Sequence, residues 1–161
     1  MATRETKYPD TKTFHFYNAN PKNRITGDCT ERALCTALDI SWEECVKGMM
    51  EVSIKTKYAY GCKEVIDKYL ALHGFEKMKQ PRKSDNTKYT GEDFCRAINA
   101  GRILKGYTGS IVAMIGSHHI VCIKKVEDLT TKDWKKIYKV CDIWNSTRNC
   151  IGNYWIKEET K

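Results

Sequence analysis

The sequence predicts an α+β fold in which a mainly helical part, residues 1–100, precedes an antiparallel sheet. In the first part, apolar residues recur at helical spacing behind Asp, Ser and Thr residues that are typical of helix N-termini. After residue 110, segments rich in Ile and Val are separated by polar turns, which is typical of buried strands. Because helices come before strands and do not alternate with them, the pattern favours α+β over α/β.

Four segments carry helix signals. Asp28 is a good N-cap, and Glu31 three residues later completes a capping-box pattern ahead of an apolar face. Ser41 and Glu44 form a second capping box, and Thr90 is the predicted cap of the last helix. The predicted helices cover residues 29–38, a segment after Ser41, residues 62–72 and a short segment after Thr90.

Five segments are predicted strands, and the rest is loop. The strands cover residues 13–17, 110–115, 118–123 and 135–144, and residues 151–156 form a last strand or a turn. Residues 1–12 are polar and are predicted to be a frayed N-terminal segment, and residues 13–161 to be a single domain.

Charge and composition exclude some classes of protein. The chain of 161 residues has a formal net charge of +8, which raises the question of nucleic acid or an acidic partner. The basic residues are scattered and no run of five occurs, so we interpret them mainly as a solubilising surface and expect no nucleic acid. No apolar stretch approaches the length of a membrane span.

The eight cysteines are predicted to be mostly small core residues. The N-terminal residues lack the apolar region of a signal peptide, so we expect a cytoplasmic protein with reduced thiols. No Cys-x-x-Cys pair occurs, which gives a structural zinc site little support. Neither a metal nor a cofactor is predicted.

Three residues form a candidate catalytic set. Cys29 is the first residue of a predicted helix, where the helix dipole favours a thiolate. The charge of Asp28 opposes this, so an imidazole partner is needed. His119 lies at the start of one predicted strand and Asp142 near the end of the next, and antiparallel pairing would bring the two together.

Each assignment has an alternative. Cys29 could be an unreactive helix residue, and Asp142 a solvated charge at a strand end. His118 could be the base in place of His119, but successive strand residues face opposite ways, so only one of the two histidines can serve.

Three short motifs resemble the papain-like cysteine peptidase superfamily. They are Gly27-Asp28-Cys29 before a helix, Ser117-His118-His119-Ile120-Val121 at a strand start, and Asp142-Ile143-Trp144 at a strand end. The compact bacterial forms that process bacteriocin leaders are the most similar, together with small proteins of this fold from bacteria and phages.

The resemblance implies a papain-like fold whose N-terminal helical part carries the nucleophile. It makes Cys29 the nucleophile, His119 the general base and Asp142 the residue that orients the base. The superfamily has a Gln six residues before the Cys as an oxyanion-hole donor. Asn23 occupies that position here, and Asn20 is a weaker candidate.

The predicted function is therefore that of a cysteine peptidase, which hydrolyses a peptide or isopeptide bond through a thioester. One alternative is transglutaminase- or deamidase-like acyl transfer by the same triad. Another is a non-enzymatic basic protein that binds nucleic acid or a host protein. The expected partner is a protein or peptide substrate, with an acidic one as an open possibility because of the net charge.

Overall fold

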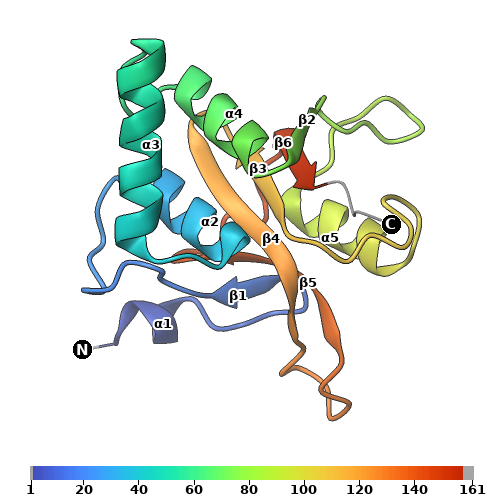
Figure 1. Ribbon diagram of the computed structural model, residues 1–161. Coiled ribbons are helices and arrows are strands. Elements are labelled where there is room, and N and C mark those ends of the chain that lie inside the picture. Colours follow the sequence, from blue (N-terminus) through green and yellow to red (C-terminus); the bar gives the residue numbers. More distant parts are fainter. Residues whose placement is uncertain (1, 158–161) are drawn as a thin grey trace.

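The computed structural model describes residues 2–157, within which five helices and a six-stranded sheet form an α+β fold (Figure 1). The helices are α1 (Arg4–Lys7), α2 (Cys29–Leu38), α3 (Trp42–Thr56), α4 (Lys63–Leu72) and α5 (Gly91–Asn99). The strands are β1 (Phe14–Phe16), β2 (Phe75–Met78), β3 (Ile111–Ile115), β4 (His119–Glu127), β5 (Lys136–Asp142) and β6 (Ile151–Lys157). None of the described helices is long and apolar enough to cross a membrane.

The sheet is mixed, whereas the sequence predicted an antiparallel one. Its strand order is β1-β5-β4-β3-β6-β2, and only β1 and β5 are parallel neighbours. Phe16 lies opposite Asp142, and the next residue, Tyr17, donates its backbone N–H to the Asp142 carbonyl at 2.9 Å. A parallel pair requires a long connection, which all the helices after β1 and three of the strands supply.

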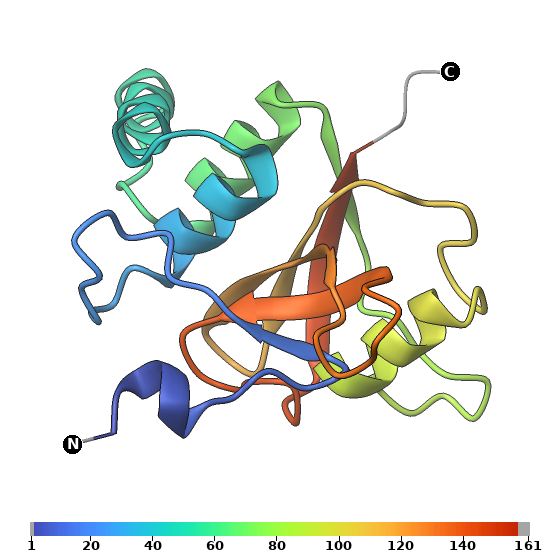
Figure 2. The ribbon, with the colours of Figure 1, turned by 90° about the horizontal axis from the view of Figure 1, so that it is seen from below.

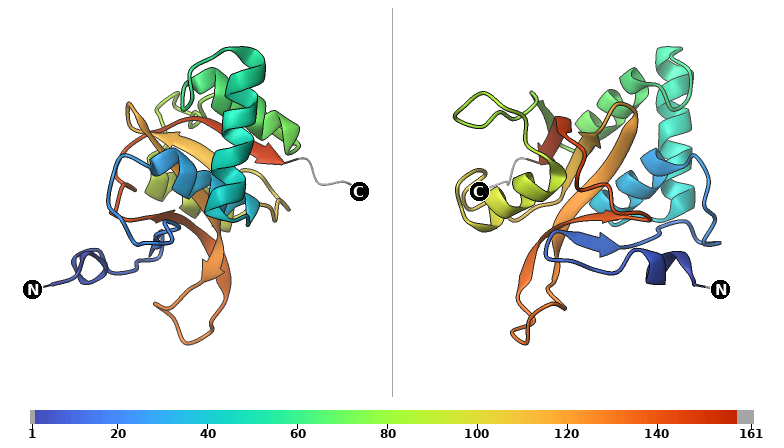
Figure 3. Two further views of the ribbon diagram at one scale, coloured as in Figure 1. Left: turned by 60° about the vertical axis from the view of Figure 1, so that its left-hand side comes forward. Right: turned by 180° about the vertical axis from the view of Figure 1, so that it is seen from behind.

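Helices cover both faces of the sheet (Figures 2 and 3). The helices α2, α3 and α4 lie on one face, and α5 lies on the other. Successive strand residues point to opposite faces of the sheet: Val112 packs with α2, α3 and α4, and Ala113 packs with α5. The core therefore has two layers, one on each face of the sheet.

Two of the predicted helix caps are confirmed, and the third is confirmed in its position but not in its side-chain hydrogen bond. The Ser41 side chain accepts from the Glu44 N–H, and the Thr90 side chain accepts from the Asp93 N–H. Asp28 precedes α2, but its side chain makes no cap hydrogen bond. Its carboxylate is held by two other side chains, described below.

The N-terminal segment, predicted to be frayed, contains α1 and packs against the body of the protein. Arg4 Nε donates to the Ile143 carbonyl at 2.7 Å, and Asp10 Oδ1 accepts from the Phe16 backbone N–H at 2.9 Å. These bonds hold polar residues 2–12 in place without any buried side chain in α1. Met1 and residues 158–161 lie outside the described part of the chain.

Five of the eight cysteines are buried, as expected for small core residues. Cys29, Cys62 and Cys150 are partly exposed, and all eight are free thiols.

Candidate active site

The nucleophile candidate, Cys29, is the first residue of α2 and is partly buried against the sheet. The first backbone N–H groups of a helix have no partner within the helix. Because the Asp28 carboxylate does not cap them, these N–H groups stay available beside the Cys29 sulfur.

The base candidate and its carboxylate meet where β4 begins and β5 ends. These strands are antiparallel neighbours, with Cys122 opposite Cys141, which brings the start of one close to the end of the other. His119 Nε2 lies 2.6 Å from Asp142 Oδ2, and the Asp142 side chain is almost completely buried. The structure thus brings these two residues together as the sequence predicted.

Cys29 completes the group, because its thiol lies close enough to the His119 imidazole for each to shift the pKa of the other. Since Nε2 faces Asp142, the ring nitrogen left for the sulfur is Nδ1. A cysteine from α2, a histidine from β4 and an aspartate from β5 therefore form one group of interacting side chains.

The environment lowers the pKa of Cys29 and raises that of His119. Burial by itself raises the thiol pKa, but the hydrogen bonds from His119 and the Ile120 backbone, together with the His119 charge, lower it overall. Burial opposes a charged His119, yet the hydrogen bonds with Asp142 and Cys29 raise the imidazole pKa to about 9. Both shifts favour a thiolate–imidazolium pair at neutral pH.

The Asp142 carboxylate is held by more than its histidine. Its Oδ1 accepts from the Ile143 backbone N–H at 2.7 Å, and its Oδ2 accepts from the Ser146 hydroxyl at 3.0 Å. Ser146 is itself fully buried in the turn that follows β5. These bonds fix the orientation of the carboxylate, so it can in turn fix the imidazole.

Arg32 is a site residue that the sequence reasoning missed. It is buried on α2, forms an ion pair with Asp28 and places Nη2 3.8 Å from Asp142 Oδ1. The charge of Asp28, expected to oppose the thiolate, is thus balanced within the same helix. The spacing of Asp28 and Arg32, four residues apart in a predicted helix, is the signal that could have indicated this pair.

An aromatic ring lies against the histidine. The Trp144 and His119 ring centroids are 5.2 Å apart and their planes are tilted by 39°. Trp144 is partly exposed and contacts the imidazole.

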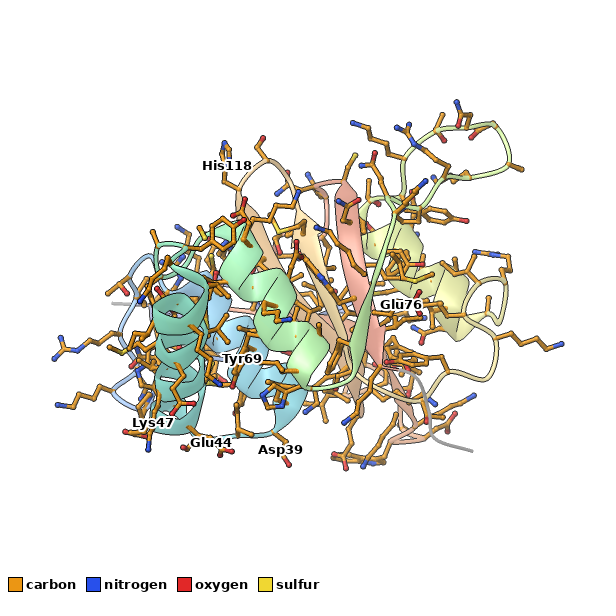
Figure 4. All side chains as sticks on the ribbon, turned by 45° about the horizontal axis from the view of Figure 1, so that its top comes forward. Asp39, Glu44, Lys47, Tyr69, Glu76 and His118 are labelled. Atoms are coloured by element: carbon orange, nitrogen blue, oxygen red, sulfur yellow. The ribbon has the colours of Figure 1, made fainter. Side chains whose placement is uncertain are left out.

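His118 does not join this group. It is exposed and points outward from the turn between β3 and β4, at the top of the view in Figure 4. His118 belongs to this turn and not to β4, whereas His119, the first residue of β4, is directed toward Asp142.

The two oxyanion-hole candidates lie on the loop before α2. Asn23 is exposed with a backbone φ of 52°, and its side chain makes no hydrogen bond to any described residue. Asn20 is buried, and its amide N–H₂ donates to Asp28 Oδ2 at 2.9 Å. Asn20 is therefore committed to Asp28, while the Asn23 amide is free to reorient, and its role stays a prediction.

No group of three or more His, Cys, Asp or Glu side chains that could hold a metal ion occurs among residues 2–157.

Comparisons with models of protein families, with curated proteins and with solved structures found no match.

Proposed function

We propose that the protein is a cysteine peptidase of papain-like fold, with Cys29 as nucleophile, His119 as general acid and base, and Asp142 as the orienting carboxylate. The observation that carries the proposal is that His119 is hydrogen-bonded to buried Asp142 and interacts with the Cys29 thiol at the start of α2. A thiol that only stabilises the core needs neither an imidazole partner nor a place at a helix N-terminus.

In the first half of the reaction, the Cys29 thiolate attacks the carbonyl carbon of the substrate. The negative charge that develops on the carbonyl oxygen is stabilised by backbone N–H groups at the start of α2, with Asn23 as the candidate second donor. His119 then gives its proton to the leaving nitrogen, the C–N bond breaks, and a thioester on Cys29 remains.

In the second half, a water molecule resolves the thioester. His119, neutral after its proton transfer, removes a proton from the water as the water oxygen attacks the thioester carbon. The C–S bond breaks, the carboxylic acid product leaves and the thiolate–imidazolium pair is restored. If an amine attacks instead, the same residues perform acyl transfer, so the alternative function needs no other site.

Formation of the thioester can be tested with p-nitrophenyl acetate. We expect a burst of one p-nitrophenolate per protein molecule and acetylation at Cys29, seen by peptide mass mapping. Cys29→Ala should show no burst but an unchanged thermal unfolding curve, since Ala is favourable in helices. A burst that persists in Cys29→Ala would contradict the proposal.

Fluorescein-labelled casein and dansylcadaverine distinguish the two outcomes of the thioester. Cleavage of the casein by the wild type and not by Cys29→Ala would support a peptidase. Incorporation of dansylcadaverine into casein without cleavage would favour acyl transfer and reject hydrolysis as the main activity.

A further inference from the structure

A cavity of about 410 Å³ adjoins the proposed catalytic group. It lies between the start of α4 and the sheet, and its lining includes Thr30, Lys63, Ile66, Met114, Ile120 and Trp155. Its volume is within the range of ligand sites in proteins, about 300–1,000 Å³. His118, at the top of Figure 4, marks its position on the β3–β4 turn, far in that view from Glu44 and Lys47.

The cavity shares a wall with the reactive sulfur. Thr30 directly follows Cys29 and Ile120 directly follows His119, and both line the cavity. The Thr30 side chain and the Ile120 backbone also lie close enough to the Cys29 thiol to lower its pKa. A substrate side chain bound in the cavity therefore lies close to the carbonyl carbon that Cys29 attacks.

The wall on the side of the sheet and α4 is apolar, with Ile66, Met114, Ile120 and Trp155 contributing most of it. Trp155 presents its ring without an unsatisfied polar atom, because its Nε1 donates to Asp67 Oδ1 at 3.2 Å. Such a surface favours an aliphatic or aromatic side chain, whose burial releases water from both partners.

The charge at the cavity has one sign. Lys63 is exposed on the first turn of α4 and lines the cavity, and no Asp or Glu is among the lining residues. Glu64, the neighbour of Lys63, is exposed outside the lining. An ammonium group in the ligand would meet Lys63 without a compensating carboxylate, whereas a carboxylate would be attracted to it.

We propose that this cavity binds a large apolar side chain of the peptide that Cys29 attacks, and that Lys63 selects peptides with a carboxylate next to that side chain. The proposal rests on the proposed function, because it assigns the substrate class of the same site: acidic peptides with a bulky apolar residue close to the bond that is cleaved.

Chloroacetyl amino acids test the cavity without a known substrate. The Cys29 thiolate displaces chloride from their CH₂ group and forms a thioether, which places the amino acid side chain beside the sulfur. The probes are chloroacetyl-phenylalanine, its amide, chloroacetyl-glycine and chloroacetyl-lysine amide. The rate at Cys29, followed by mass spectrometry at pH 6, is divided by the rate with glutathione to remove intrinsic reactivity.

We expect chloroacetyl-phenylalanine to react roughly tenfold faster or more than chloroacetyl-glycine, the effect of burying one aromatic side chain. It should also react faster than its own amide by about two- to fivefold, as expected for an exposed charge pair. Chloroacetyl-lysine amide should be the slowest of the side-chain-bearing probes.

Two variants of one helix separate the role of Lys63 from that of net charge. In Lys63→Glu the preference for the phenylalanine carboxylate over its amide should vanish or reverse. Lys68→Glu makes the same charge change on α4, at an exposed residue outside the lining, and should keep the preference.

Equal normalised rates for the phenylalanine and glycine probes would overturn the proposed cavity, even if Cys29 is highly reactive. Loss of the carboxylate preference in both variants would reject Lys63 as the selecting residue. A Cys29 that reacts no faster than glutathione with every probe would contradict the activated thiol, while the phenylalanine-to-glycine ratio would still decide the cavity.

Discussion

Cys29 and Cys141 both lie near Asp142, yet their surroundings shift their thiol pKa values in opposite directions. Cys141 directly precedes Asp142 in β5 and is buried, and this burial raises its pKa to about 12 although Lys124 acts against it. Cys29 reaches Asp142 only through His119, and its pKa is lowered.

The comparison shows that closeness to the buried carboxylate does not activate a thiol. The Asp142 charge itself raises the pKa of Cys141. Activation requires an imidazole between the thiol and the carboxylate. The negative charge of Asp142 stabilises the protonated imidazole, and the positive charge of that imidazole stabilises the thiolate.

The largest expected difference between the two cysteines is in their rates of alkylation. With iodoacetamide at pH 6, we expect Cys29 to be modified at least about a hundredfold faster than Cys141, because only thiolates react. Peptide mass mapping after brief treatment measures both sites in one sample. The same treatment in guanidinium chloride is the control and should abolish the difference. Alkylation of Cys29 no faster than that of Cys45 or Cys150 would contradict an activated nucleophile.

Removing the imidazole should make Cys29 resemble an ordinary thiol. In His119→Ala we expect most of the selectivity for Cys29 to vanish and ester turnover to fall by about 10²- to 10⁴-fold, the usual contribution of general acid–base catalysis. His118→Ala is the matched control and should keep both, since His118 is exposed and lines only the cavity, which an acetyl ester or iodoacetamide is too small to need. The reverse pattern would assign the base to His118.

The pH profile provides a second readout for His119. Because its pKa is raised to about 9, His119 holds its proton below that pH and loses it as the pH rises through it. Wild-type peptide hydrolysis should therefore decline above about pH 9, where His119 no longer carries the proton for the leaving nitrogen. This alkaline decline should be absent from the residual activity of His119→Ala.

A smaller effect is expected from Asp142→Asn. The amide oxygen can still accept the imidazole N–H, but the side chain no longer carries the charge that supports imidazolium and attracts Arg32. We expect slower alkylation of Cys29 at pH 6 and reduced but measurable ester turnover. Cys141→Ala, a change at the adjacent residue, should leave both rates unchanged. Wild-type rates in Asp142→Asn would indicate that another residue orients His119.

The sequence predicted those features that depend on local patterns. Ser41 and Thr90 act as caps because a hydroxyl just before a helix accepts a backbone N–H of the first turn. Asp28 has two uses, as a cap and as an ion-pair partner of Arg32, and local spacing does not decide between them. The strand β2 was not among the predicted strands. It has only one buried residue, Phe75, and one buried residue does not make an alternating pattern.

Long-range features were beyond the sequence patterns. The parallel pairing of β1 with β5 joins segments separated by most of the chain. Lys139 is fully buried in β5 with its Nζ 3.4 Å from Asp128 Oδ1, although a lysine in a strand predicts an exposed position. The candidate triad could be predicted from the sequence because each of its members lies at or near the end of a predicted element, where pairing of the strands leaves few arrangements.

The pairing of β1 with β5 also bears on when the site forms during folding. Cys29 lies on the short loop-and-helix segment that follows β1, while His119 and Asp142 come from strands near the end of the sequence. Contacts between such distant segments form slowly, because the chain must close a large loop before they gain any stability. A chain that has folded only its helices holds an ordinary, weakly nucleophilic thiol. The reactivity of Cys29 is thus a chemical marker for completion of the sheet. Until the last strands have paired, Cys29 is too weak a nucleophile to attack the peptide bonds of the nascent chain itself.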